Sequence, residues 1–201
     1  MFYEPDKRDR SVLRHDPFKA IVAPRPIGWI TSMSAKGEIN LAPYSYFNGV
    51  SSKPPVVMFA SEGRKDSVTN IEATGEFVCN LATWDLREAM NATSAPLPHG
   101  VNEMERAGLT AGPSRLVRAP RVAEAPCALE CRLLRILTLD DLAGRPTDCH
   151  VVFGQVVGVH IDDHFIKDGL LDTAAMQPIA RCGYDEYAAV ESVFSMARPA
   201  T

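Results

Sequence analysis

The sequence contains no long hydrophobic run, and its cysteines form no Cys-x-x-Cys pair. The strongest apolar run, Val56–Ala60, is far shorter than the ~20 residues that a membrane-spanning helix needs. The first ten residues are rich in charge where a signal peptide would have an apolar core, so we expect a cytoplasmic protein with no membrane partner. Five cysteines, an odd number, favour reduced thiols over a disulfide framework or a zinc site, and we expect no metal.

Basic residues are not in excess, because 21 Lys and Arg stand against 25 Asp and Glu and give a net charge of -4. Nucleic-acid binding depends on neutralising phosphates with a basic face, so we expect no nucleic-acid partner. The Gly-x-Gly-x-x-Gly fingerprint and the nucleophile-elbow pattern are also absent. Their absence argues against a doubly wound dinucleotide-binding fold and against a serine hydrolase.

What the chain does have is 201 residues, 46% of them hydrophobic, which suits one folded domain spanning residues 1–201. Runs of β-branched and aromatic residues alternate with turn residues, a pattern typical of antiparallel strands. We expect a mainly β fold, a closed or nearly closed barrel with a few short helices, because closure removes exposed sheet edges. The expected strands are Ile27–Ser34, Pro55–Ala60, Glu76–Ala82, Ala128–Leu137 and Val151–Ile161.

Helix signals are few and short. Asp66–Thr74 is predicted to be a helix capped by Asp66 and closed by Gly75, and Thr83–Ala92 a second helix. Asn102 opens a third, short helix with a capping-box pattern. Two prolines make Ser94–Gly100 an irregular surface loop. We expect both tryptophans, Trp29 and Trp84, in the core.

The start of the first helix has the chemistry of an anion site. A helix N-terminus offers unpaired N–H groups and a positive dipole end, to which Arg64 and Lys65 add two charges and Ser67 a donor. Asp66, an acid in the same turn, counts against this interpretation unless its carboxylate is turned away. From these residues alone, a capped helix with a solvated basic pair remains the alternative.

Small polar residues gather at Thr31–Ser32 and at 45–52, where Gly49 interrupts the run. Such residues let the backbone approach the polar edge of a planar ring system closely, so this region fits a ring that lies against a loop. The alternative is an ordinary turn-rich barrel loop.

Seven motifs then follow one another in order and resemble the flavin reductase-like family with the FMN-binding split barrel. The resemblance extends from about Phe18 to Pro199. The motifs are Gly28-Trp29-Ile30-Thr31-Ser32, Asn40-x-Ala42-Pro43-x-Ser45-x-Phe47, Ser52-x-Pro54-Pro55, Lys65-Asp66-Ser67-x-x-Asn70-Ile71, Gly75-Glu76-Phe77-x-x-Asn80-Leu81, His150-Val151-Val152-Phe153-Gly154-x-Val156 and Pro178-Ile179-x-Arg181-x-Gly183-x-Asp185-x-Tyr187.

This resemblance implies a Greek-key-like split barrel and a homodimer with FMN near the subunit interface. It implies hydride transfer from NADH or NADPH to flavin, with reduced flavin supplied in some members to a partner monooxygenase. The strand with Thr31–Ser32 and the loop Phe47–Ser52 would line the ring, and Arg64, Lys65 and Ser67 would hold the phosphate. The implied FMN residues are Trp29, Ile30, Thr31, Ser32, Ser45, Phe47, Asn48, Gly49, Val50, Ser51, Ser52, Arg64, Lys65, Asp66, Ser67 and Arg181.

His150 is the candidate catalytic residue. Short reductases of this family often carry Gly-Asp-His before the late strand, whereas here the stretch is Asp148-Cys149-His150, so the His matches and the two preceding residues do not. The alternative function is therefore a non-catalytic flavin-binding or electron-carrier module without nicotinamide reductase activity. A small barrel for another ligand or a protein partner is a third interpretation. His160 and His164, four residues apart on an extended segment, lie too far apart for one metal ion.

Overall fold

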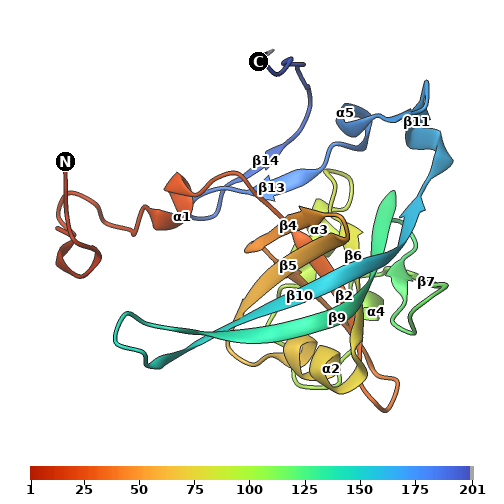
Figure 1. The fold of residues 1–201 in the computed structure, drawn as a ribbon, viewed down its shortest axis with the longest axis horizontal. Helices are drawn as coiled ribbons and strands as arrows, with labels where there is room; N and C mark the ends of the chain where they lie inside the picture. The colour runs from red at the N-terminus through yellow and green to blue at the C-terminus, as the bar shows by residue number, and fades with distance from the viewer. Residues whose placement is uncertain (200–201) are drawn as a thin grey trace.

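The computed structural model describes residues 1–199, and its main element is a seven-stranded antiparallel sheet (Figure 1). The sheet curves into a barrel, which confirms the predicted mainly β fold. Its strands, in sheet order, are β3 (Ile39–Tyr44), β2 (Gly28–Met33), β6 (Glu76–Leu81), β9 (Cys127–Asp140), β10 (Pro146–Ile161), β5 (Pro55–Glu62) and β4 (Phe47–Ser52).

Short elements surround this sheet. The helices are η1 (Pro5–Lys7), α1 (Phe18–Ile21), α2 (Asp66–Thr74), α3 (Arg87–Ala92), α4 (Glu103–Arg106), η2 (Asp163–Phe165) and α5 (Thr173–Met176). The small sheets are β1 (Arg25–Pro26) with β13 (Ile179–Arg181) and β14 (Tyr187–Ala189), β7 (Ala111–Gly112) with β8 (Arg121–Val122), and β11 (Ile166–Lys167) with β12 (Leu170–Leu171). Among these residues, no helix combines the length and apolar character needed to cross a membrane.

The five predicted strands and the helix Asp66–Thr74 are confirmed, but the stretch from 39 to 52 differs from the prediction. Phe47–Ser52 is not a loop: it forms β4, which pairs with β5, and Ile39–Tyr44 forms β3, which pairs with β2. A register shift at Gly49/Ser51 lets the glycine-containing strand follow the curved sheet. Consecutive in sequence, β3 and β4 lie at opposite ends of the sheet order, and in the described part of the chain they do not pair. The barrel is split there.

Two helical predictions and the prediction for Trp84 need smaller corrections. Asp66 does not cap α2, because the N-cap is Lys65 and no side chain caps the helix, whereas Gly75 ends it in the left-handed conformation with φ 74° as predicted. Helix α3 starts at Arg87 instead of Thr83, since Thr83 bridges to Pro178. Trp84 is not a core residue: its side chain lies at the surface, where Arg87 stacks on the ring 4.0 Å from its centroid.

The barrel interior is filled from both the sheet and helix α2. Phe59 and Phe77 meet edge to face at 5.8 Å, and Val68 and Ile71 of α2 pack into the same cluster and close one end of the barrel. Gly154 permits this packing, because a Cβ there would lie 2.4 Å from the Phe77 ring.

The cysteines are free thiols, as expected. Cys79 and Cys131 are buried in the barrel, and desolvation raises the pKa of the Cys79 thiol to about 12, which makes that thiol unreactive at neutral pH.

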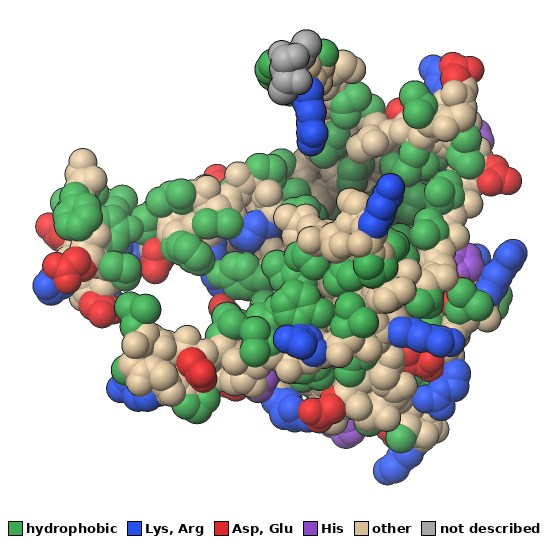
Figure 2. Space-filling model, in the orientation of Figure 1, with side chains coloured by type: hydrophobic (Ala, Val, Ile, Leu, Met, Phe, Trp, Pro, Cys, Tyr) green, Lys and Arg blue, Asp and Glu red, His purple; other side chains and the backbone are tan. Residues whose placement is uncertain are grey.

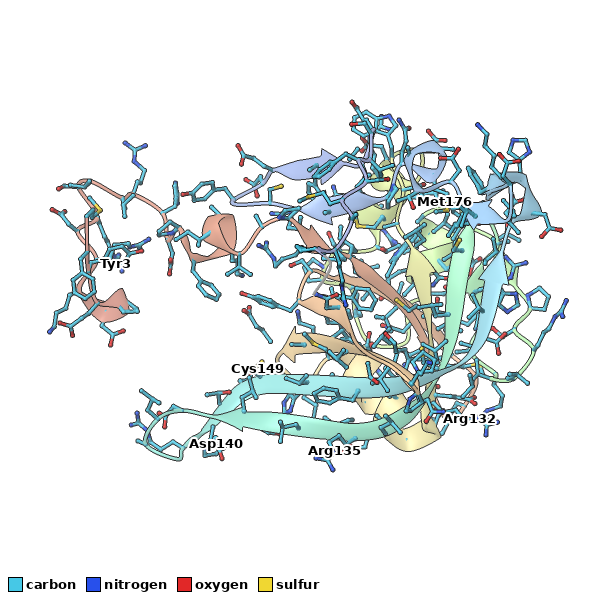
Figure 3. All side chains as sticks on the ribbon, turned by 45° about the horizontal axis from the view of Figure 1, so that its top comes forward. Tyr3, Arg132, Arg135, Asp140, Cys149 and Met176 are labelled. Atoms are coloured by element: carbon cyan, nitrogen blue, oxygen red, sulfur yellow. The ribbon has the colours of Figure 1, made fainter. Side chains whose placement is uncertain are left out.

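Strands β9 and β10 continue past the barrel as a long hairpin. Figure 1 shows this hairpin and the N-terminal segment projecting from the same side of the molecule. Leu137, Leu139 and Leu142 of the hairpin are exposed, and Figure 3 shows Asp140 near its tip. A projecting arm with exposed leucines has no apolar partner within the described chain.

Candidate functional site

A cavity of about 450 Å³ lies where the N-terminus of α2, strand β3 and the loop after α3 come together. The turn Tyr44–Tyr46, which joins the edge strands β3 and β4 at the split in the barrel, is part of its lining. Its lining residues are Lys19, Asn40, Ala42, Pro43, Tyr44, Ser45, Tyr46, Ala60, Glu62, Lys65, Asp66, Ser67, Thr93, Ser94, Ala95, Pro96, Leu97 and Glu103. The cavity thus contains four of the residues predicted from sequence: Ser45, Lys65, Asp66 and Ser67.

The start of helix α2 supplies donors to this cavity. Lys65 is the N-cap, so the backbone N–H groups of the first turn have no helical acceptor, and no side chain caps them. Within residues 1–199 the Lys65 ammonium forms no ion pair, although it lines the cavity. The Ser67 hydroxyl accepts a hydrogen bond of 2.9 Å from Asn40 and therefore has its own proton to donate. This end of the cavity is suited to an anion.

Tyr44 adds an unpaired donor at the same place. Its ring packs against Phe59, and its side chain is buried, with the phenol oxygen lacking any hydrogen-bond partner among the described residues. Burial raises the pKa of Tyr44, while the nearby hydroxyls of Ser67 and Ser61 act in the opposite sense. Within the fold the hydroxyls of Ser67 and Ser61 are close enough to act on the phenol, and a ligand oxygen in the cavity would be a further acceptor for its proton.

Three acids also border the cavity, and each already has a partner. Asp66 is 2.8 Å from His99, Glu62 is 3.8 Å from Lys19, and Glu103 accepts a hydrogen bond from the backbone N–H of Leu41 at 3.0 Å. Burial raises the pKa of Glu103. The Asp66 carboxylate is thus turned toward His99. The sequence analysis allowed an anion site here only if this carboxylate was turned away from it.

Arg64 does not line the cavity. Its guanidinium forms an ion pair with Glu72 on the outer face of α2. The two basic residues predicted to bind the anion therefore have different positions. Lys65 lines the cavity, whereas Arg64 forms an ion pair on the surface of α2.

Trp29, Ile30, Thr31 and Ser32 lie on β2, fully buried, and none of them lines the cavity. The Trp29 indole donates to Thr93 at 2.9 Å, and Thr31 accepts from Asn80 at 2.9 Å. Ser32 accepts from Asn40 and Asn70, both at 3.3 Å. Because Asn40 also donates to Ser67, this network ties β2 to the first turn of α2.

The residues of β4 lie beside the cavity rather than in its lining. Phe47 packs on Gly28 and on the barrel core, whereas the rest of the strand is exposed. Since β4 is an edge strand, one side of its backbone is unpaired. The exposed residues are Asn48, Gly49, Val50, Ser51 and Ser52.

His150 lies on β10 opposite Ser61 of β5, outside the cavity lining. Its Nδ1 is 3.2 Å from the Thr138 hydroxyl and its Nε2 is 3.7 Å from Asp148. Figure 3 shows the adjacent Cys149 on the outer half of the hairpin. Arg181 borders an adjoining cavity. In the described chain no cluster of three His, Cys, Asp or Glu side chains could hold a metal ion.

The sequence analysis did not single out Tyr44 and Lys19, which line the cavity, or His99, which pairs with Asp66. Tyr44 lies between Pro43 and Ser45 of a quoted motif, and its position there was the available signal. Lys19 and His99 come from segments far away in sequence, and no local pattern marks them.

Comparison with known proteins identifies the family and the fold. The family described as "Flavin reductase like domain" matches residues 22–178. An uncharacterized protein of Aquifex aeolicus is 37% identical over 83% of this chain and 85% of its own length. Nitrilotriacetate monooxygenase component B from Bacillus cereus is 30% identical, with a TM-score of 0.88 and 98% of each chain covered. The Pseudomonas fluorescens 2-nitrobenzoate 2-nitroreductase NbaA is 27% identical, with a TM-score of 0.82 and coverage of 94% of this chain and 91% of that chain.

The family match covers more than half of the chain, and the relatives share its split-barrel fold. Flavoredoxin of Desulfovibrio vulgaris, 20% identical with a TM-score of 0.76 over 87% of this chain and 91% of its own, has the same fold. The chain belongs to the flavin reductase-like family, a family of flavoproteins with oxidoreductase members.

Proposed function

We propose that this chain is a cytoplasmic NAD(P)H-dependent flavin reductase that holds FMN in the cavity at the start of α2. The observation that carries this proposal is the coincidence, in one cavity, of the unpaired Lys65 ammonium, the uncapped first turn of α2 and the unpartnered Tyr44 phenol. A phosphate oxygen would accept from all three.

The residues that line the cavity fit FMN in their charge and in the volume that they enclose. The dianionic phosphate matches the N-terminus of α2 together with Lys65 and Ser67. The neighbouring turn Tyr44–Tyr46 and loop 93–97 provide small and apolar side chains against which a planar ring can lie. When bound, the flavin would supply the hydride chemistry.

The protein's own residues would position FMN and enclose it. Ser32 and Asn40 hold Ser67 at the phosphate end, and thus the predicted residues of β2 act from behind the site. The free edge of β4 starts one residue after Tyr46, so its backbone groups are available to a ligand that extends out of the cavity. His150 would act on the hydride donor from the hairpin.

Two relatives suggest how the reduced flavin is used. The name monooxygenase component B supports delivery of reduced flavin to a partner oxygenase, and the nitroreductase supports direct reduction of an acceptor. One observation supports the alternative of a non-catalytic flavin-binding module: Asp148 and Cys149 stand before His150 where reductases of the family often have Gly-Asp.

We also propose that the protein is a homodimer. The leucines of the β9–β10 hairpin are exposed, and so are Val193 and Phe194 near the C-terminus. Burial of such surface against a second copy would be favourable. Light scattering of the FMN-loaded protein at micromolar concentration should give twice 22.0 kDa, and a value of the single-chain mass would contradict the proposal.

The test of function has two steps. The purified protein should bind FMN and show the absorption spectrum of bound flavin. Failure to bind flavin would contradict the proposed function. NADH or NADPH oxidation that depends on added FMN separates the reductase from the non-catalytic module, which would bind FMN without oxidising either nucleotide.

A further inference from the structure

A second cavity of about 290 Å³ adjoins the first and shares four lining residues with it: Lys19, Pro43, Ser45 and Ser94. Its remaining walls come from β1, α3 and the β13–β14 hairpin. A molecule in the second cavity would therefore touch the same turn, Pro43–Ser45, as a ligand in the first.

The charged groups that line this cavity are all basic. Lys19, Arg25 and Arg181 line it, and no acid does. Lys19 has only the distant Glu62 at 3.8 Å, and Arg181 has Asp185 at 3.3 Å, a side chain that is fully exposed to water. Exposed pairs of this kind neutralise little charge. Figure 2 shows basic side chains where the N-terminal segment joins the body of the molecule.

Arg25 is the decisive residue. It is 6% exposed and has no carboxylate partner among residues 1–199. Its guanidinium donates to the backbone carbonyls of Lys19, Val22 and Cys182, while its Nε has no hydrogen-bond partner. Carbonyl dipoles satisfy donors without supplying a countercharge, and a buried charge without one is costly. The Arg25 side chain borders the second cavity, and an anion bound there would supply the missing countercharge.

Flat aromatic faces accompany these charges. The Tyr46 ring, which lines the adjoining first cavity, lies 5.7 Å from the Lys19 ammonium and 5.9 Å from the Arg25 guanidinium. Arg181 stacks on Tyr187 at 4.5 Å and donates to its hydroxyl at 2.5 Å, so ring and charge are held as one unit. A planar molecule with an acidic group is complementary to both features.

We propose that the second cavity binds the anionic group, carboxylate or phosphate, of a planar molecule that reacts with flavin held in the first cavity. This inference rests on the proposed function, since it assumes flavin in the first cavity. Arg25 and Arg181 are the anion-binding residues, and Tyr184 and Tyr187 shape the wall. The same chemistry is offered by the phosphates of a nucleotide and by the carboxylate of an aromatic acid.

The experiment titrates two probes, ADP and benzoate, into protein saturated with FMN, by calorimetry and by the visible flavin spectrum. Binding of FMN is measured first on each variant. Arg181→Gln removes a charge from the second cavity, and Arg87→Gln is the matched control, because Arg87 stacks on Trp84 nearby without lining this cavity. Arg25→Lys keeps the charge but removes the fork of donors.

We expect at least one probe to bind the FMN-loaded protein and to perturb the flavin spectrum. Its affinity should fall about tenfold or more in Arg181→Gln, the loss of one charge-assisted hydrogen bond, and should be unchanged in Arg87→Gln. Binding of ADP assigns the cavity to a nucleotide, and binding of benzoate assigns it to an aromatic acid.

Three outcomes would overturn the inference. If FMN binds but neither probe does at millimolar concentration, the second cavity is not an anion site although the flavin proposal stands. If Arg181→Gln lowers the affinities for FMN and the probe by the same factor, the residue belongs to the flavin site. If the protein does not bind FMN at all, the proposed function fails and this inference with it.

Discussion

The Nδ1 of His99 lies 2.8 Å from Oδ1 of Asp66, and this pair joins the loop after α3 to the first turn of α2. The hydrogen bond to Asp66 and the charge of that carboxylate raise the pKa of His99. Protonated His99 therefore offsets the one acid in the turn that is proposed to hold phosphate.

From this pair we predict that FMN affinity falls as pH rises through the raised pKa of His99. Because the folded-state pKa lies above the usual value of about 6.5, the stabilisation is complete below that value and is lost at higher pH. The second ionisation of the FMN phosphate, with a pKa of about 6, is nearly complete above neutrality, so a titration from neutral to alkaline pH isolates His99.

The matched variants are His99→Gln, which should bind FMN with an affinity independent of pH in this range, and Asp66→Asn, which should do the same while binding FMN more tightly. An unchanged pH dependence in His99→Gln would show that another group titrates.

Lys65→Ala should weaken FMN binding about 10- to 150-fold, which corresponds to roughly 1.5–3 kcal/mol for a charge-assisted hydrogen bond. Riboflavin lacks the phosphate, so its affinity should barely change, and the FMN effect should shrink as salt rises. Arg64→Ala should cost less, because Arg64 is paired with Glu72 outside the cavity. Lys36→Ala, in an exposed turn, is the control. Equal losses for FMN and riboflavin would mean that Lys65 supports the fold instead.

Local signals predicted α2 well, because Gly75 in the left-handed conformation marks its end and the apolar spacing of Val68 and Ile71 marks its buried face. The same signals failed for β3 and β4. Pro43 and Gly49 weaken a strand pattern, and only pairing with β2 and β5, together with burial of Leu41 and Tyr44, makes these segments extended.

The site shows a similar division. The helix N-terminus, Lys65 and Ser67 were predictable, since their chemistry is local in sequence. That Thr31 and Ser32 face asparagines, and that His99 reaches Asp66, depends on the tertiary fold. The motif around Pro43 and Ser45 marks the position of Tyr44, but its burial and its lack of a close hydrogen-bond partner depend on the tertiary fold.

His150→Ala should lower turnover more than FMN affinity, because His150 lies outside the cavity lining and matches the nicotinamide-side motif of the family. Steady-state rates at saturating FMN, together with an FMN titration, separate the two effects. Thr138→Val, which removes the hydroxyl 3.2 Å from Nδ1, should have a smaller effect on turnover. Loss of FMN binding with turnover retained at saturating FMN would contradict the assignment.

Gly154→Ala should destabilise the protein by about 1–3 kcal/mol, the usual cost of overpacking, because the new Cβ would overlap the Phe77 ring. Gly49→Ala is the matched control, also in a strand, where a Cβ has no atom within 4 Å. Urea unfolding followed by fluorescence gives both values. Equal midpoints for the two variants would mean that the ring moves aside freely.

The strand order β3-β2-β6-β9-β10-β5-β4 also determines when the barrel can be completed during synthesis. Strand β5 pairs with β4 at once, but its other neighbour is β10, which lies nearly a hundred residues later. Until β10 emerges from the ribosome, the apolar strand β5 and the barrel side of β9 both present open edges. Contacts so distant in sequence slow folding, and open edges favour pairing between chains. A nascent or truncated chain that ends before β10 is therefore the species most prone to aggregate.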